Sequence, residues 1–135
     1  MRHINATKVF ISAYRPELTP EQATQRTFRL VQAIEALDEV VGFRRVTGFF
    51  DGNFETSVIA FLQVGSILDG IDKLRDLARR FEQDSILVVH GDNAAELVEC
   101  HTDSSAIIGR FQVAEDGPEP GEDYTLADST YYVVR

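Results

Sequence analysis

The stretch ETSVIAFLQV, residues 55 to 64, decides how the fold is interpreted, because it alternates like a β-strand and is apolar on both faces. Successive side chains of a strand point to opposite faces of the sheet. One face suits a covering layer of helices and carries Val58, Ala60, Leu62 and Val64. The opposite face is mixed and carries Glu55, Ser57, Ile59, Phe61 and Gln63. Because two of these are large and apolar, the second face should also be covered.

Residues 8 to 14, KVFISAY, repeat this pattern and predict a second strand with Phe10, Ser12 and Tyr14 on the mixed face. That face can be covered by copies of the same chain or by C-terminal strands that fold back over it. We favour copies of the chain, and the sequence therefore predicts a homo-oligomer.

Two helices are predicted from capping signals and helical periodicity. Thr19 is a capping residue, Pro20 follows at the first helical position, and Gln22 completes a capping box. The apolar stripe of this first helix contains Ala23, Thr27, Leu30, Val31, Ile34 and Leu37. The stripe of the second helix contains Ile67, Ile71, Leu74, Ala78 and Phe81.

Further strands are predicted over residues 43–50, 85–90, 94–101, 106–114 and 130–135, with a hairpin turn at 51–53 and an acidic loop at 115–123. The order strand, helix, strand, strand, helix, strand is that of an α+β ferredoxin-like βαββαβ sandwich. We therefore predict a single ferredoxin-like domain, residues 1–135, with additional C-terminal β-strands.

The net charge, the cysteine content and the distribution of apolar residues indicate which partners and which cellular compartment to expect. The 135 residues carry a net charge of −9, which argues against a nucleic-acid partner. Cys100 is the single cysteine, so nothing indicates an oxidising compartment. No stretch approaches the roughly 20 apolar residues that a membrane span needs. We expect a cytoplasmic protein without a membrane partner.

Catalytic signatures are few. The sequence contains no metal-ligand spacing, no defensible Ser/His/Asp order and no phosphate-binding glycine loop. We therefore predict neither a metal site nor a cofactor.

Several short motifs, in this order along the chain, resemble the phage enzymes that degrade S-adenosylmethionine, the adomethioninases. These motifs are ISAYRPEL at 11–18, a helix with Arg26, VTGFFDGNFETS at 46–57, LARRFEQDSILVV at 77–89, IGRFQ at 108–112 and DYTL at 123–126. Family members commonly have an aromatic residue after the Thr-Gly turn. Phe49 and Phe50 follow Thr47-Gly48 here, without the hydroxyl that a tyrosine would provide.

The resemblance implies a homotrimer of ferredoxin-like subunits with sites between neighbours, acting in the cytoplasm of an infected bacterial host against restriction-modification. It also implies cleavage of S-adenosylmethionine by lyase chemistry, in which the substrate carboxylate attacks its own γ-carbon. The products are then 5′-methylthioadenosine and L-homoserine lactone. Such a reaction needs alignment of the substrate and a dry pocket, with one carboxylate to hold the substrate ammonium.

Strand parity offers two polar residues of the mixed face for the chemistry that the resemblance implies. Glu55 is predicted to hold the ammonium group, the alternative being a solvated glutamate at a strand end. Ser12 is predicted to bind the substrate carboxylate, the alternative being a strand serine satisfied by a neighbour. Arg15 either reaches that carboxylate or pins the loop before Pro16.

Aromatic side chains complete the predicted site. Tyr14 and Phe50 are expected to stack on adenine or to face the sulfonium, with Phe49 beside Phe50. Tyr124 is expected to form part of a neighbouring subunit's wall. For all four, the alternative is packing in the core or at an interface.

Three other functions stay open at the level of sequence. A hydrolase would use water as the nucleophile and release homoserine directly. A non-catalytic PII-like trimer would bind a nucleotide-like ligand and signal through a long loop, for which residues 115–123 are the candidate. An acidic protein that mimics DNA would cluster its acids in rows, whereas here acids and bases are interspersed.

Overall fold

The structure, a computed structural model, describes residues 6–135. Two helices and eight strands follow in the order β1 Lys8–Ser12, α1 Pro20–Glu35, β2 Val40–Phe50, β3 Asn53–Leu62, α2 Ile67–Arg80, β4 Ser85–Val89, β5 Ala94–Glu99, β6 Ser105–Val113, β7 Tyr124–Ala127 and β8 Thr130–Val134.

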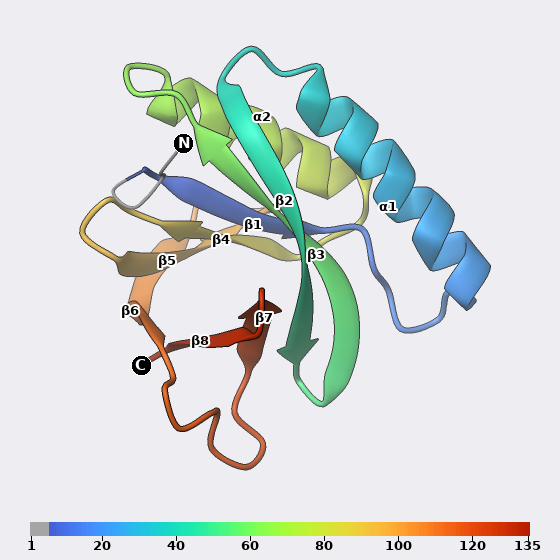
Figure 1. Cartoon of the computed structure of the whole chain (residues 1–135). Coiled ribbons are helices and arrows are strands. Elements are labelled where there is room, and N and C mark those ends of the chain that lie inside the picture. Colours follow the sequence, from blue (N-terminus) through green and yellow to red (C-terminus); the bar gives the residue numbers. More distant parts are fainter. Residues whose placement is uncertain (1–5) are drawn as a thin grey trace.

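The strands form one closed antiparallel barrel in the order β1-β3-β2-β7-β8-β6-β5-β4, with β4 returning to pair with β1 (Figure 1). The predicted ferredoxin-like sandwich is therefore wrong. A sandwich of that kind ends in free strands at β2 and β4, whereas here β2 pairs with β7 and β4 pairs with β5. Closure removes the long sheet edges that an open sheet would expose.

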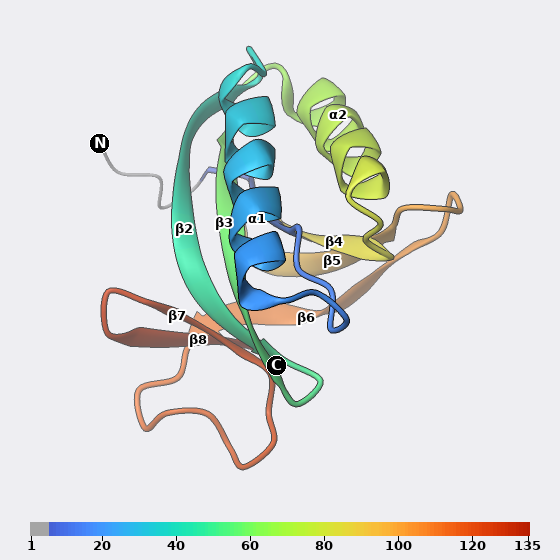
Figure 2. The ribbon, with the colours of Figure 1, turned by 90° about the vertical axis from the view of Figure 1, so that its right-hand side faces the viewer.

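Both helices lie outside the barrel against one side of the sheet, while β7 and β8 lie on the other side of β2 and β3 (Figure 2). The larger apolar core lies between the helices and the sheet, and it contains Val58, Ala60 and Leu62 as predicted. Val64 lies beyond the end of β3 and is exposed. The capping box of Thr19 and Gln22 is confirmed at the start of α1.

A second, smaller core fills the inside of the barrel. Phe10 and Ile59 are buried there with Val46 and Val89. The rings of Phe10 and Phe111 lie 5.3 Å apart between centroids. The mixed face is thus covered by the chain's own C-terminal strands. The mixed face therefore gives no support to the predicted homo-oligomer, because no second copy is needed to bury Phe10 and Ile59, and the oligomer stays a prediction.

Several element boundaries differ from the prediction. β1 ends at Ser12, so Tyr14 and Arg15 lie in the loop that leads to α1. β7 was not predicted, although it provides the strand next to β2. Within residues 6–135, no helix is long and apolar enough to cross a membrane.

Candidate functional site

A surface cavity of about 450 Å³, called here the first cavity, lies where the end of β1 meets the start of α1 and the β2–β3 hairpin. Its walls carry one carboxylate, Glu55, one guanidinium, Arg45, and the phenol of Tyr14. Threonines of α1 and β2, among them Thr24 and Thr47, add hydroxyl groups. Ligand pockets commonly have volumes of about 300–1,000 Å³, so this cavity is large enough for a small molecule.

The β2–β3 pairing sets the positions of the strand residues in the first cavity. Thr47 lies opposite Thr56, and Gly48 lies opposite Glu55. Directly paired residues share a face of the sheet, so Glu55 lies on the face of Gly48 and Phe50, whereas Thr56 lies on the face of Thr47. Gly48 is also closely packed, since a Cβ atom added there would lie 2.2 Å from Cε2 of Phe50.

Glu55 is half-buried at the start of β3. The Ser57 hydroxyl donates a hydrogen bond of 3.3 Å to Glu55 Oε1. Burial raises the pKa of Glu55, and hydrogen bonds from the hydroxyls of Ser12 and Ser57 partly oppose that rise. The result is a carboxylate that is poorly solvated, and therefore suited to attract a cationic ligand group.

Ser12 lies on the same face of the sheet as Glu55, because it pairs with Ser57. Its hydroxyl donates to the carbonyl of Thr56 at 3.2 Å and accepts from the amide of Tyr14 at 3.0 Å. A serine hydroxyl has one proton, so Ser57 is the more secure donor to Glu55. Ser12 thus supports both Tyr14 and the start of β3.

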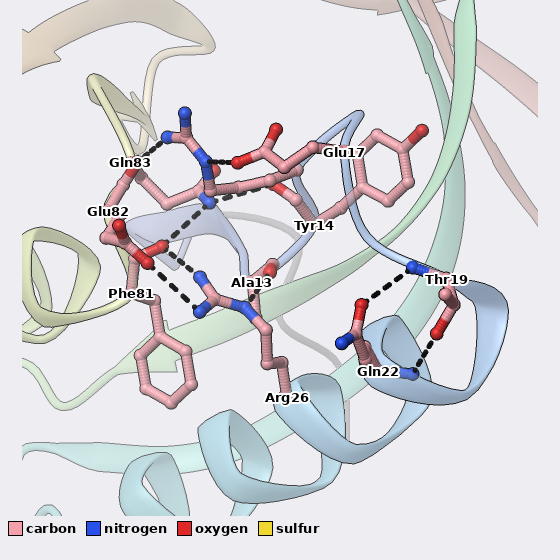
Figure 3. A network of polar contacts seen from close by, with 10 residues as sticks. Ala13, Tyr14, Glu17, Thr19, Gln22, Arg26, Phe81, Glu82 and Gln83 are labelled. Carbon is pink, nitrogen blue, oxygen red and sulfur yellow. Dashed lines mark hydrogen bonds and ion pairs between the residues drawn. The ribbon is translucent and has the colours of Figure 1, made fainter.

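Arg15 lies away from the first cavity and fixes the loop. Its Nε forms an ion pair of 2.5 Å with Glu17, and its Nη1 donates to the carbonyl of Glu82 at 2.6 Å. Figure 3 shows this loop between α1 and the turn that follows α2. In this arrangement Arg15 performs the pinning role that the sequence analysis gave as its alternative.

Tyr14 lines the first cavity, whereas the other predicted aromatic residues lie at or near a second cavity of about 410 Å³. Phe50 and Tyr124 line it. Phe49 stacks on Tyr124 with 5.3 Å between ring centroids and 19° between ring planes. Phe49 and Tyr124 also lie 4.9 and 6.5 Å, between ring centroids, from Phe54, which lines the first cavity. Phe50 packs over Gly48, the strand partner of Glu55, so these aromatic side chains lie close to the first cavity of the same chain.

The sequence matches the model of the S-adenosylmethionine lyase family over residues 9–135. The chain belongs to that family. The resemblance found in the short motifs is confirmed, and it extends over nearly the whole chain. The family consists of lyases, so the protein is an enzyme with S-adenosylmethionine as its substrate. No curated protein matches the sequence.

Glu55 is the carboxylate that lines the first cavity, and its surroundings are partly buried. Within residues 6–135, no group of three or more His, Cys, Asp or Glu side chains is arranged to hold a metal ion.

Four residues that were not predicted as site residues also line the first cavity, namely Arg45, Thr47, Thr24 and Thr27. One signal was available: Arg45 and Thr47 alternate with Val46 along β2 and so share one face. A second was the helical spacing that places Thr24 and Thr27 on one side of α1.

Proposed function

We propose that this family member cleaves S-adenosylmethionine to 5′-methylthioadenosine and L-homoserine lactone. The match to the S-adenosylmethionine lyase family over residues 9–135 carries the proposal. The half-buried carboxylate of Glu55 in a cavity of ligand size supports it.

The reaction is an intramolecular displacement. A carboxylate oxygen of the substrate forms a bond to its own γ-carbon, and the bond from that carbon to sulfur breaks. The electron pair of the broken bond stays on sulfur, which becomes the neutral thioether of methylthioadenosine. No water, proton or metal ion is consumed, so the atoms and charges of one substrate balance those of two products.

Alignment and desolvation are the two contributions expected of the protein. Holding the carboxylate, γ-carbon and sulfur in line makes use of effective molarities on the order of 10⁵ M or more. Opposite charges neutralise each other as the reaction proceeds, so a site drier than water favours the less polar transition state. Glu55 holds the substrate ammonium group, and the phenol of Tyr14 contacts the adenosine or the sulfonium.

A homotrimer with shared sites fits this chemistry better than a single chain does. The first cavity is open to solvent, and the ring of Phe54 at its edge is 63% exposed. A neighbouring subunit that covered Phe54 would exclude water from Glu55. In this arrangement Tyr124 of the neighbour forms a wall next to the substrate, and Phe50, with Phe49 beside it, stacks on adenine or faces the sulfonium. Ser12 and Arg15 stabilise the loop that carries Tyr14.

The biological setting follows from the same proposal. A phage enzyme that destroys S-adenosylmethionine in the cytoplasm of an infected bacterium removes the cofactor of restriction-modification systems. This anti-restriction role predicts that expression of the chain in a bacterium lowers the cellular pool of S-adenosylmethionine.

Incubating the purified protein with S-adenosylmethionine tests the proposed reaction. We expect methylthioadenosine to accumulate, with homoserine lactone as the first amino-acid product. Trapping that product with hydroxylamine separates a lactone from homoserine formed directly by hydrolysis. Intact substrate after prolonged incubation would refute the proposal.

Binding of an adenosine ligand without turnover would instead favour the PII-like signalling trimer. The proposed signalling loop is tied down in this chain. Glu122 makes an ion pair of 2.9 Å with Arg135, and Asp123 accepts a hydrogen bond of 2.9 Å from the amide of Asp51. A loop held in this way is poorly suited to reach a partner.

A further inference from the structure

Arg26, on α1, connects three segments of the chain (Figure 3). Its Nε donates to the carbonyl of Ala13 at 2.9 Å, and its Nη2 donates to the carbonyl of Phe81 at 2.5 Å. Its Nη1 lies 3.2 Å from Oε1 of Glu82. The side chain is only 19% exposed, and its guanidinium lies 5.6 Å from the centre of the Phe81 ring.

Gln83 binds the next carbonyl along the same loop. Its Nε2 donates to the carbonyl of Tyr14 at 3.0 Å and to that of Phe81 at 3.2 Å. The carbonyls of two consecutive residues after β1 are therefore held by side chains from outside the strand. Tyr14 has no strand partner of its own, because β1 ends at Ser12.

The turn after α2 is built to receive these donors. Glu82 has a φ of 61°, the left-handed conformation that glycine usually provides at the end of a helix. The amide of Gln83 bonds back to the carbonyl of Ala78 at 3.0 Å, which closes the turn. The carbonyl of Phe81 then points outward at the negative end of the helix dipole, where the positive charge of Arg26 is stabilised.

We propose that Arg26 and Gln83, called here the clamp, are positioning residues that set the place of Tyr14 in the wall of the first cavity. The proposal rests on the proposed function for its catalytic consequence. Neither residue lines the first cavity, so each acts through the main chain of residues 13 and 14. Arg26 also fixes the strand end to α1, whose Ala23, Thr24 and Thr27 form the facing wall.

Because the clamp places a group and does not bind substrate, its loss should lower kcat more than it raises KM. A displacement of about 1 Å can reduce a reaction rate roughly 100-fold when the reaction depends on alignment. We expect Arg26→Ala to lower kcat about 10- to 100-fold while KM changes less than about 3-fold. Arg26→Lys should recover only part of this loss. A lysine ammonium group lacks the planar, fixed arrangement of donors with which the arginine guanidinium binds two carbonyl groups at once.

Arg75 provides a matched control. It is 20% exposed and donates through Nε to the carbonyl of Glu99 at 2.8 Å and through Nη2 to the carbonyl of Thr102. It thus fixes a loop by the same chemistry, but outside the first cavity. Arg75→Ala should lower stability as Arg26→Ala does, and should leave kcat within about 2-fold of the wild type. Equal kcat values for the two variants, when both are folded, would overturn the proposal.

An NMR measurement that does not depend on enzymatic activity tests the clamp separately from the proposed function. With ¹³C-labelled tyrosine, the Tyr14 ring signal can be assigned by its loss in Tyr14→Phe. We expect Gln83→Met, which keeps the side-chain volume but removes the donor, to shift or broaden that signal. The signals of Tyr124, Tyr131 and Tyr132 should stay in place. An unchanged Tyr14 signal in both Gln83→Met and Arg26→Lys would overturn the proposal even if the enzyme cleaves S-adenosylmethionine.

Discussion

Ser57 donates a hydrogen bond of 3.3 Å to Glu55 from two residues further along the same face of β3. The two side chains share a face because their positions differ by two in a strand. Burial raises the pKa of Glu55, and the Ser57 hydrogen bond limits that rise by stabilising the ionised form. Burial and hydrogen bonds from hydroxyl groups, among them that of Ser57, therefore together influence the pKa of Glu55.

Replacing Ser57 with alanine should move the acid side of the pH–rate profile to higher pH. If Glu55 holds the substrate ammonium as proposed, activity requires the ionised carboxylate and falls as the pH drops through the raised pKa of that group. Removing the hydrogen bond raises this pKa further. A profile of kcat/KM against pH, measured for the wild type and for Ser57→Ala, checks the shift. Identical acid limbs would mean that Glu55 does not control activity in this range.

Glu55→Gln should abolish most turnover and at the same time stabilise the fold at neutral pH. The raised pKa means that the folded chain favours the protonated, uncharged carboxyl group, and its contribution to stability is lost as pH rises through that pKa. Glutamine resembles the protonated form at every pH, so the thermal midpoint at pH 7 should rise by a few degrees.

Calorimetry at pH 7 and at about pH 4 checks this change in stability. The difference between Glu55→Gln and the wild type should shrink at the lower pH, where the wild-type carboxyl group is protonated as well. A variant that is less stable than the wild type at pH 7, or that is fully active, contradicts the role given to Glu55.

Phe111 closes the inside of the barrel from the C-terminal half of the chain. Its ring lies 5.3 Å from that of Phe10 and stacks on Tyr132 at 5.1 Å, with 6° between the planes. Phe111→Ala should lower the free energy of unfolding by about 2–3 kcal/mol, somewhat less than for a fully buried phenylalanine. Urea unfolding at several protein concentrations measures the change.

Phe28→Ala is the matched control, because that ring is 55% exposed on α1 and its removal should cost little. Equal effects of the two substitutions would mean that strand β6 does not close over Phe10 in solution, and the barrel would then be open.

Local signals made the helices and the central hairpin predictable. The capping box at Thr19 and the apolar stripe of α1 lie within one segment, so neighbouring residues determine that structure. The alternation along β3 correctly placed Val58 and Ile59 on opposite faces, since they belong to the two different cores. Parity also correctly placed Ser12 on the face of Glu55.

Closure of the barrel was not predictable in the same way. It depends on β7 and β8, two strands of four and five residues that follow an acidic loop, and on the pairing of β7 with β2, which lies in the N-terminal half of the chain. Nothing local to Tyr124–Ala127 indicates that β2 is its partner. The error carried over to the site, because an open sheet would have left Phe10 and Ile59 as an interface between subunits.

If substrate binds between neighbouring subunits, two variants that are each inactive should recover activity when they assemble in one trimer. Glu55→Gln lacks the carboxylate of the first cavity, and Tyr124→Leu lacks an aromatic group of the second, which we propose a neighbour contributes. In a randomly assembled mixed trimer, about one quarter of the sites would combine an intact Glu55 with an intact Tyr124 from the next subunit. Co-expression of the two variants with different tags, followed by an assay for methylthioadenosine, measures this recovery.

The pair Glu55→Gln and Tyr14→Leu serves as the control, because both residues line the first cavity of one chain. If one subunit provides both Glu55 and Tyr14 to a site, every subunit of a mixed trimer lacks one of these residues. No site is then complete, and no activity returns. Recovery with the Tyr124 pair alone requires that substrate lies between neighbouring chains. Failure of both mixtures, with trimers present, would place the whole site within one subunit and leave the aromatic residues of the second cavity with a packing role.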